Sequence, residues 1–230
     1  PENTMPAFQG AVDLGFQYVE TDVHATADGV LVAFHDTGLD RVTDKTGKIS
    51  ELPWSQVREA LVDGREPIPR FAELMQTFPN LKVNIDPKSD DAVAPLIREL
   101  KELDALDRVC VGAFSDSRLG KFHDEFGEDI CLSMGPIEVV TARLSSWGLP
   151  KKTFRGRAAQ VPMRQGLIPI TDKRFIERMH SLDIAVHVWT IDEIDDMNLL
   201  LDLGVDAIMT DVPATLLDVF TERGLWPNES

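Results

Sequence analysis

Charged side chains stand at the ends of three short apolar stretches of the sequence. They are Glu20 and Asp22 in YVETDV, His35 in VLVAFH, and Asp86 and Lys88 in LKVNIDPK. Residues two apart in a strand share a face, so Glu20 and Asp22 are expected to point the same way. Carboxylates gathered on one face are costly unless a cation neutralises them. The pattern therefore predicts a site that contains or binds positive charge.

These residue types suit phosphoryl chemistry. The carboxylates of Glu20, Asp22 and Asp86 offer only oxygen ligands, which favour one hard divalent cation, Mg²⁺ or Ca²⁺, over zinc. Lys88 would bind an anion, and His35 is the natural proton carrier near neutral pH. A metal and an ammonium take up charge on phosphate oxygens while an imidazole protonates a leaving alkoxide. We therefore expect His35 to act as general acid or base.

Alternating strand and helix patterns would position these residues. Eight apolar runs read as strands: YVETDV, VLVAFH, LKVNID, VCVGAFS, ICLSMG, AAQVPM, VHVWTI and AIMTDV. Helix-length amphipathic segments separate most of them, at 92–103, 117–126, 137–147, 173–182 and 193–203. This βα repetition predicts a largely parallel sheet. We expect a TIM-type (β/α)₈ barrel, with reactive groups at the carboxyl ends of its strands, and a doubly wound open sheet as the alternative.

Two intervals depart from the βα rhythm. The strands containing Glu20 and Ala33 are too close for a crossover helix between them. Residues 36–69 are rich in turn residues and are expected to form a small insertion within a single domain, 1–230. A strand upstream of Pro1 would raise the number of predicted strands to nine, one more than a (β/α)₈ barrel holds. We therefore expect one of VLVAFH, CLSMG and AAQVPM to lie outside the barrel.

The amino-acid composition of the chain argues against several classes of function. The chain has 230 residues, 43% of them hydrophobic, which is enough for a sizeable core. Its formal net charge of −16 argues against a nucleic-acid partner, because phosphate backbones are bound by surplus Lys and Arg. No apolar stretch approaches the ~18 residues of a membrane helix. We expect a cytoplasmic protein with a small-molecule substrate, while its oligomeric state is not predicted.

Several motifs together resemble the glycerophosphodiester phosphodiesterases. They are PENTM, ETDVHATADGVLVAFHDTGLDRVTDKTG, NIDPK, VHVWTID and GVDAIMTDVP. The resemblance implies a TIM barrel with a small insertion after the His-Asp motif. It implies that Glu20, Asp22 and Asp86 hold the metal, that His35 is one of two catalytic histidines, that Lys88 contacts phosphate, and that Trp189 lines the site. The substrate would be a glycerophosphodiester such as glycerophosphocholine, cleaved to glycerol 3-phosphate and an alcohol.

The sequence departs from this family at two places. The third acid is usually Glu, whereas Asp86 is one methylene shorter. The other catalytic histidine belongs to a His-Arg-Gly motif, which is expected just upstream of Pro1. Glu2 and Asn3 are expected to cap the first helix and to buttress that motif. His24 shares the face of Glu20 and Asp22, so it would either support the site from behind or lie at its rim.

Two other functions fit the same residues. A lysophospholipase D or a sphingomyelinase D-like enzyme resembles this family in its acids and histidines, and Asp86 with Lys88 fits that variant. A barrel that binds phosphodiesters without cleaving them is the alternative outside enzymology. A binder has no need of a proton donor beside a metal, so His35 favours an enzyme.

Overall fold

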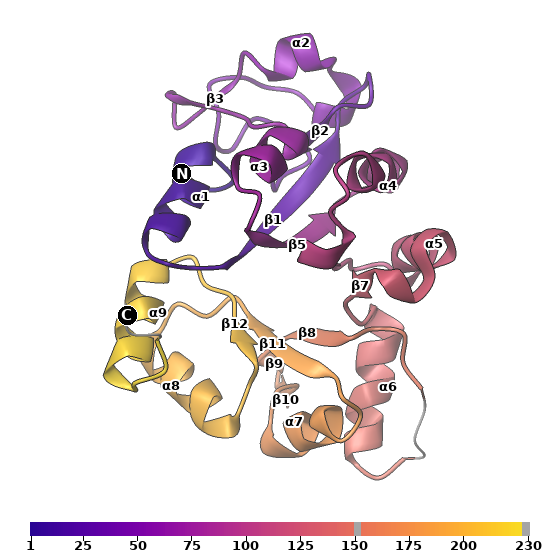
Figure 1. Cartoon of the computed structure of the whole chain (residues 1–230), viewed down its shortest axis with the longest axis vertical. Helices are drawn as coiled ribbons and strands as arrows, with labels where there is room; N and C mark the ends of the chain where they lie inside the picture. Colours follow the sequence, from indigo (N-terminus) through magenta and orange to yellow (C-terminus); the bar gives the residue numbers. More distant parts are fainter. Residues whose placement is uncertain (150–152, 227–230) are drawn as a thin grey trace. The chain divides into compact units, whose positions relative to one another are not determined.

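The computed structural model describes residues 1–149 and 153–226, which divide into two compact units, Pro1–Cys131 and Leu132–Ser230. Each unit is described by itself. In the first unit the sheet order is β2-β1-β5-β6-β7 (Figure 1). The strands are β1 (Tyr18–Ala25), β2 (Leu31–Ala33), β5 (Lys82–Pro87), β6 (Val109–Val111) and β7 (Cys131–Leu132). Its main helices are α1 (Met5–Asp13), α3 (Phe71–Thr77), α4 (Val93–Glu102) and α5 (Asp116–Phe126).

The central pair of this sheet is parallel and carries the predicted acids. β1 pairs with β5 over six residues, from Tyr18 opposite Lys82 to Val23 opposite Pro87. β5 pairs in turn with β6, also in parallel. Pro87 has no N–H for the ladder, but the Lys88 N–H donates to the carbonyl O of Val23 at 3.1 Å and continues the pairing. The chain is therefore held in register to the end of the strand.

β2 runs antiparallel to β1, with Ala25 opposite Leu31. The VLVAFH segment is thus the strand that does not take part in the parallel βα repetition, which confirms the expectation of one such run. A short connection explains the geometry, because two antiparallel strands can be joined by a turn whereas parallel strands need a crossover.

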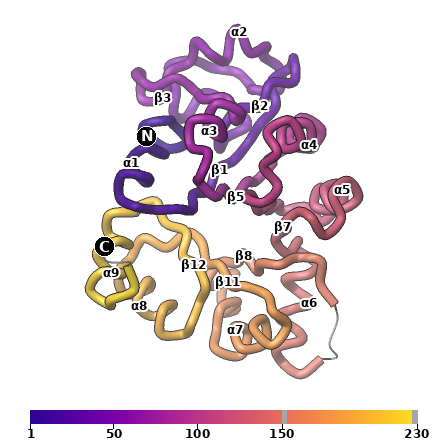
Figure 2. Tube along the Cα trace, viewed as in Figure 1, coloured from indigo at the N-terminus to yellow at the C-terminus, as the bar shows by residue number. Residues whose placement is uncertain are grey.

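The predicted insertion contains several short elements. They are η1 (Ile49–Glu51), α2 (Trp54–Val57), β3 (Leu61–Val62) and β4 (Glu66–Pro67). Its buried side chains form a small core together with residues of β2 and the segment that follows it: Val32, Phe34, Leu39, Ile49, Val57, Ala60, Val62 and Ile68. The insertion lies beside the N-terminal end of the chain (Figure 2), where Arg41 contacts Glu2.

The start of the chain corrects the predicted helix cap. Thr4, not Asn3, is the N-cap of α1, and its hydroxyl accepts a hydrogen bond from the Ala7 N–H at 3.4 Å. Asn3 lies one residue earlier with a φ of 53°, a left-handed conformation that Asn tolerates better than most residues. Glu2 does not cap the helix either, because its carboxylate pairs with Arg41.

The second unit repeats the strand and helix alternation. Its parallel sheet has the order β12-β11-β8, with β8 (Ala158–Pro162), β11 (Ala185–Trp189) and β12 (Ala207–Ile208). A hairpin, β9 (Arg164–Gln165) and β10 (Ile168–Pro169), follows β8. The helices are α6 (Pro136–Ser146), α7 (Lys173–His180), α8 (Ile194–Leu203) and α9 (Pro213–Glu222). The five predicted helices are present within one or two residues, whereas α3, α9 and the hairpin were not predicted.

Candidate active site

Asp22, Asp86 and Lys88 form a compact charged cluster in the first unit. The strand register places Asp22 opposite Asp86 on β1 and β5. The ammonium Nζ of Lys88 lies 2.6 Å from Asp22 Oδ1 and 3.0 Å from Asp86 Oδ2. The two aspartates are only 5% and 8% exposed. Two nearly buried carboxylates thus share one ammonium, which leaves the cluster with an excess of negative charge.

The surroundings shift the pKa values of two members. Burial raises the pKa of the Asp86 carboxyl, and the charge of Lys88 offsets this only in part. For Lys88, burial acts to lower the pKa, but the hydrogen bond to Asp22 and the charges of Asp86 and Asp22 outweigh it and raise the pKa. Lys88 is therefore firmly charged, and ionised Asp86 would gain from a second cation.

Glu20 lies on the same face of β1 as Asp22, two residues further from the C-terminal end of the strand. It stands opposite Asn84 in the register and is exposed. Among the described residues, no three His, Cys, Asp or Glu side chains lie close enough together to hold a metal ion as they stand. The donor chemistry nevertheless fits a hard divalent cation, because the set consists of carboxylate oxygens and carries surplus negative charge.

His35 lies next to this cluster and is held by a carboxylate. The Phe34 N–H donates to the carbonyl O of Asp22 at 2.9 Å, which places the following residue, His35, beside it. Its Nδ1 lies 2.7 Å from Asp36 Oδ1. Since Nδ1 faces a carboxylate, it carries the ring proton and leaves Nε2 as the nitrogen that exchanges one. The His35 side chain is 54% exposed, so a ligand can reach it.

Arg41 fixes the charge of Asp36, and the sequence reading missed it. Its Nε lies 2.5 Å from Asp36 Oδ2, and its Nη2 lies 3.2 Å from Oδ1. These hydrogen bonds lower the pKa of Asp36 to about 2, so its carboxylate stays ionised at neutral pH. The other edge of Arg41 pairs with Glu2, Nη1 to Oε2 at 3.3 Å. Arg41 could have been noticed in the sequence as the arginine of the LDR stretch, which lies five residues after Asp36.

Asn3 and His24 support the site without being part of the charged cluster. The hydroxyl of Thr21, fully buried on the opposite face of β1, donates to Asn3 Oδ1 at 2.7 Å. His24 is 3% exposed, and its Nε2 donates to the carbonyl O of His35 at 3.1 Å. Burial lowers the pKa of His24, so the ring is neutral at neutral pH. Of the two positions predicted for His24, the structure shows the buried one, and its role in supporting the site stays a prediction.

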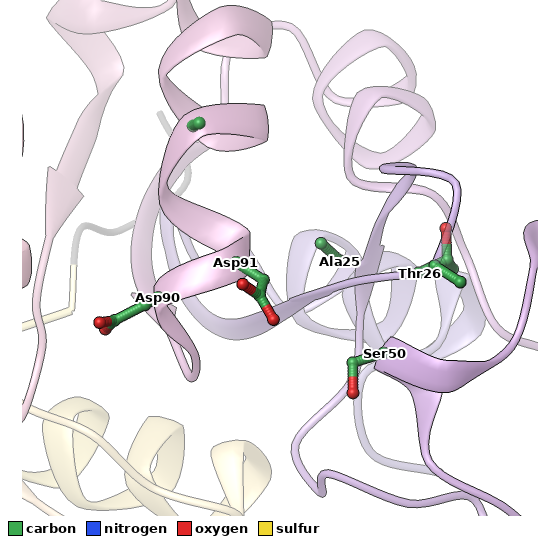
Figure 3. Close-up of a pocket in the computed structure, with 7 residues that line it drawn as sticks. Ala25, Thr26, Ser50, Asp90 and Asp91 are labelled. Atoms are coloured by element: carbon green, nitrogen blue, oxygen red, sulfur yellow. The ribbon is translucent and has the colours of Figure 1, made fainter.

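Beyond Asp22, the end of β1 borders a hollow of about 410 Å³. Figure 3 shows Ala25, Thr26 and Ser50 around it, with Asp90 and Asp91 from the turn before α4. None of its seven lining residues is a lysine or arginine. The cation next to this lining is Arg118, whose Nε donates to Asp90 Oδ1 at 2.6 Å.

Trp189 belongs to the other unit. It is the last residue of β11 and is half-buried, on the strand face that alternates with the buried Val186 and Val188. Its predicted contact with substrate stays a prediction.

Comparison with known proteins decides the family. A sequence profile of the glycerophosphoryl diester phosphodiesterase family matches residues 1–215. The chain belongs to this family. Among its relatives, a Mycobacterium tuberculosis protein named probable glycerophosphodiester phosphodiesterase 2 is 35% identical, with 98% of this chain and 88% of that protein aligned. A human lysophospholipase D is 26% identical over 94% of this chain and 81% of its own length.

Solved structures of glycerophosphodiester phosphodiesterases show the fold. The Agrobacterium tumefaciens enzyme has a TM-score of 0.78 at 22% identity and covers 94% of this chain and 93% of its own. An Oleispira antarctica phosphodiesterase in complex with the product sn-glycerol-3-phosphate has a TM-score of 0.80 at 21% identity, with coverages of 96% and 92%. The fold class is the TIM-type barrel of this phosphodiesterase family, as predicted. The family is generally dependent on a divalent metal.

Proposed function

We propose that this chain hydrolyses glycerophosphodiesters to glycerol 3-phosphate and an alcohol with the help of one divalent cation. The observation that carries the proposal is the ammonium of Lys88 held between the nearly buried carboxylates of Asp22 and Asp86, with the exposed His35 following a residue, Phe34, whose N–H is hydrogen-bonded to the Asp22 backbone. Membership of the phosphodiesterase family supports the substrate class. Relatives named for this activity support it further.

Glu20, Asp22 and Asp86 would hold the cation, Ca²⁺ or Mg²⁺. Bound there, it would neutralise negative charge on the phosphate oxygens and favour attack at phosphorus. Lys88 would then contact the phosphate as well as the carboxylates, because an ammonium has three protons to donate. Its raised pKa keeps that charge in place across the neutral range.

His35 would move the proton. In its protonated form Nε2 donates a proton to the leaving alkoxide, and Nδ1–H stays on Asp36 throughout. Asp36 is ionised because Arg41 lowers its pKa to about 2, so it stabilises the imidazolium that His35 must form. Arg41 and Glu2 position Asp36 and do not need to touch the substrate.

The direct test is hydrolysis of glycerophosphocholine by the full-length protein, measured as released glycerol 3-phosphate. We expect activity that a chelator abolishes and that added Ca²⁺ or Mg²⁺ restores. Asp22→Asn should abolish it, whereas Asp91→Asn, a matched change in the neighbouring hollow, should not. Full activity in chelator would contradict the metal site. Binding of the diester without turnover would favour the non-catalytic alternative.

Lysophospholipase D activity is a second candidate, favoured by the name of the human relative. Parallel assays of glycerophosphocholine and lysophosphatidylcholine distinguish the two. If only the lysophospholipid were cleaved, the second candidate would replace the first. The same comparison with sphingomyelin tests the sphingomyelinase D-like alternative.

A further inference from the structure

Helix α6 of the second unit turns its apolar side chains outward. All four of its exposed residues are apolar: Pro136, Ile137, Val140 and Leu144. Its three buried residues are Ala142, Arg143 and Ser145, so two of them are polar. Ile137, Val140 and Leu144 are 68%, 60% and 39% exposed. At this spacing they form one stripe, which Trp147, 54% exposed, extends beyond the helix end.

The neighbouring helix α7 shows that this arrangement is not general. Its exposed residues are Lys173, Arg174, Glu177 and His180, all polar or charged. Its buried residues, Phe175, Ile176 and Met179, are all apolar. This is the usual pattern for a helix with one face in water. The reversed pattern of α6 is therefore a property of that helix.

Two polar residues on the buried side of α6 have partners of their own, although Arg143 Nε has none among the described residues. Arg143, 5% exposed, donates from Nη1 to Asp172 Oδ1 at 2.9 Å and from Nη2 to Oδ2 at 2.5 Å. Its guanidinium also lies 4.6 Å from the ring centroid of Trp147. Ser145 Oγ accepts from Arg178 Nε at 3.3 Å. These contacts fix the rotation of the helix and keep the apolar stripe outward.

The charged residues in the sequence around the apolar stripe indicate which kind of surface it binds. The chain carries 39 acidic residues, yet residues 139–171 contain none, and this segment holds six Lys and Arg, of which Arg143 is buried and paired with Asp172. Arg155 and Arg157 are exposed. The backbone N–H groups of Arg155 and Gly156 donate to the Glu138 carboxylate at 2.7 and 3.2 Å, which ties this basic loop to the first turn of α6. The apolar stripe thus lies in a basic region of an acidic protein.

We propose that the outward face of α6 docks on a lipid surface that carries anionic headgroups. Exposed aliphatic side chains and a tryptophan next to basic residues are the composition of segments that lie in a membrane interface. The apolar stripe would enter the boundary between headgroups and acyl chains, and Arg155 and Arg157 would contact anionic headgroups. No described helix is long and apolar enough to cross a bilayer.

A second copy of the chain fits this face less well. In a symmetric dimer the same patch meets itself, so the basic loops of two copies would be brought together. Like charges brought together oppose association. The β9–β10 hairpin belongs to the same acid-free segment, and its tip residue Leu167 is 95% exposed. A protruding apolar residue of this kind is a further feature expected of a lipid-binding segment.

The test is binding of the full-length protein to vesicles of phosphatidylcholine alone or with 30% phosphatidylserine, by co-sedimentation. A phosphatidylserine content of about 30% gives the mixed vesicles a clearly negative surface. We expect binding to the mixed vesicles that weakens as salt is raised. The double variant Val140→Asp with Leu144→Asp should bind at least about tenfold more weakly, because two charges would have to enter the interface. Arg155→Glu should also weaken binding.

The matched control places the same changes on α8. Ile194 and Leu199 are 53% and 48% exposed but stand among acidic residues, so Ile194→Asp with Leu199→Asp should leave vesicle binding unchanged. Circular dichroism is used to check that each variant folds. Hydrolysis of a soluble diester by each variant should be unaffected. Equal binding to both vesicle types, or none, overturns the proposal. So does a wild-type dimer, seen by light scattering, that the α6 variant converts to a monomer.

Discussion

The two units hold buried charge in different ways. In the first, Lys88 lies between Asp22 and Asp86, so one cation faces two carboxylates. In the second, Arg143 pairs with one carboxylate, that of Asp172, through two parallel hydrogen bonds, and also donates to Ser146 Oγ at 3.3 Å. The pKa values follow this difference. The hydrogen bond from Arg143 lowers the pKa of Asp172, whereas burial raises the pKa of Asp86 despite Lys88. Charge is matched in the Arg143–Asp172 pair, whereas in the first unit the carboxylates outnumber the ammonium that lies between them.

The largest expected effect is on catalysis at the first cluster. His35→Ala should lower turnover by roughly 10²- to 10⁴-fold, the usual range for loss of general acid-base catalysis. Thermal stability should hardly change, because the side chain is half-exposed. The matched control is His180→Ala, since His180 makes a similar contact in the second unit, Nε2 to Asp206 Oδ2 at 2.8 Å. Equal losses in the two variants would remove His35 from the mechanism.

Lys88→Met tests the unbalanced cluster itself. We expect turnover to fall by roughly 10²- to 10³-fold, as on loss of one preorganised donor to the transition state. The variant would remove the ammonium that lies between Asp22 and Asp86, and the charge of Arg118 near Asp86 would not replace its hydrogen bonds, so the melting temperature should fall at pH 7. Added Mg²⁺ or Ca²⁺ should then raise the melting temperature more than in the wild type. A variant insensitive to both ions would argue that the carboxylates do not bind metal.

Asp172→Asn breaks the balanced pair. The amide can still cap α7 by accepting from the Phe175 N–H, but Arg143 would keep an uncompensated buried charge. We expect the free energy of unfolding to fall by about 2 to 4 kcal/mol, measured by urea denaturation, while turnover per folded molecule is retained. Asp202→Asn, in the exposed pair with Arg223, should change it by less than about 1 kcal/mol. A loss of turnover without loss of stability would contradict the structural role.

The smallest effect concerns a buried carboxylate without a strong cationic partner. Glu99 Oε2 has no hydrogen-bond partner in the described part of the chain, and burial raises the pKa of Glu99 to about 7. The folded protein therefore binds a proton between pH 4.5 and 7 that the unfolded chain has lost, and stability falls as pH rises through this window. Glu99→Gln should stabilise by about 2 to 3 kcal/mol at pH 8 and by nothing at pH 4. Equal effects at both pH values would contradict this account.

The sequence predicted the residues of the first cluster better than those of the second. Spacing and position at a strand end are local features, so Asp22, Asp86 and Lys88 could be found, as could Glu20, which lies outside the cluster. Arg41 was missed because its partners, Glu2 and Asp36, come together only through the fold of the insertion. Arg143 was missed because a charged residue in an amphipathic helix normally faces water, and its burial depends on Asp172, distant in sequence.

The fold was predicted where periodicity is strong and missed where it is weak. The parallel pairing of β1 with β5 and five helices follow from alternating apolar patterns. The cap at Thr4 was misassigned to Asn3, because both residue types are good N-caps and only the backbone conformation distinguishes them. The seven-residue helix α3 and the two-residue strands of the hairpin are too short to give a periodic signal.

The two partners of β1 have consequences for the order of folding. The contact of His24 with His35 closes a loop of 11 residues, whereas the Tyr18 and Lys82 side chains that meet across β1 and β5 are 64 residues apart. Closing the longer loop costs more chain entropy, so contacts between distant residues tend to form later. We therefore expect the β1–β2 hairpin to form early and the β1–β5 pairing late. The backbone that carries His35 would then be in place before the carboxylates meet, which keeps two like charges apart until Lys88 arrives with β5.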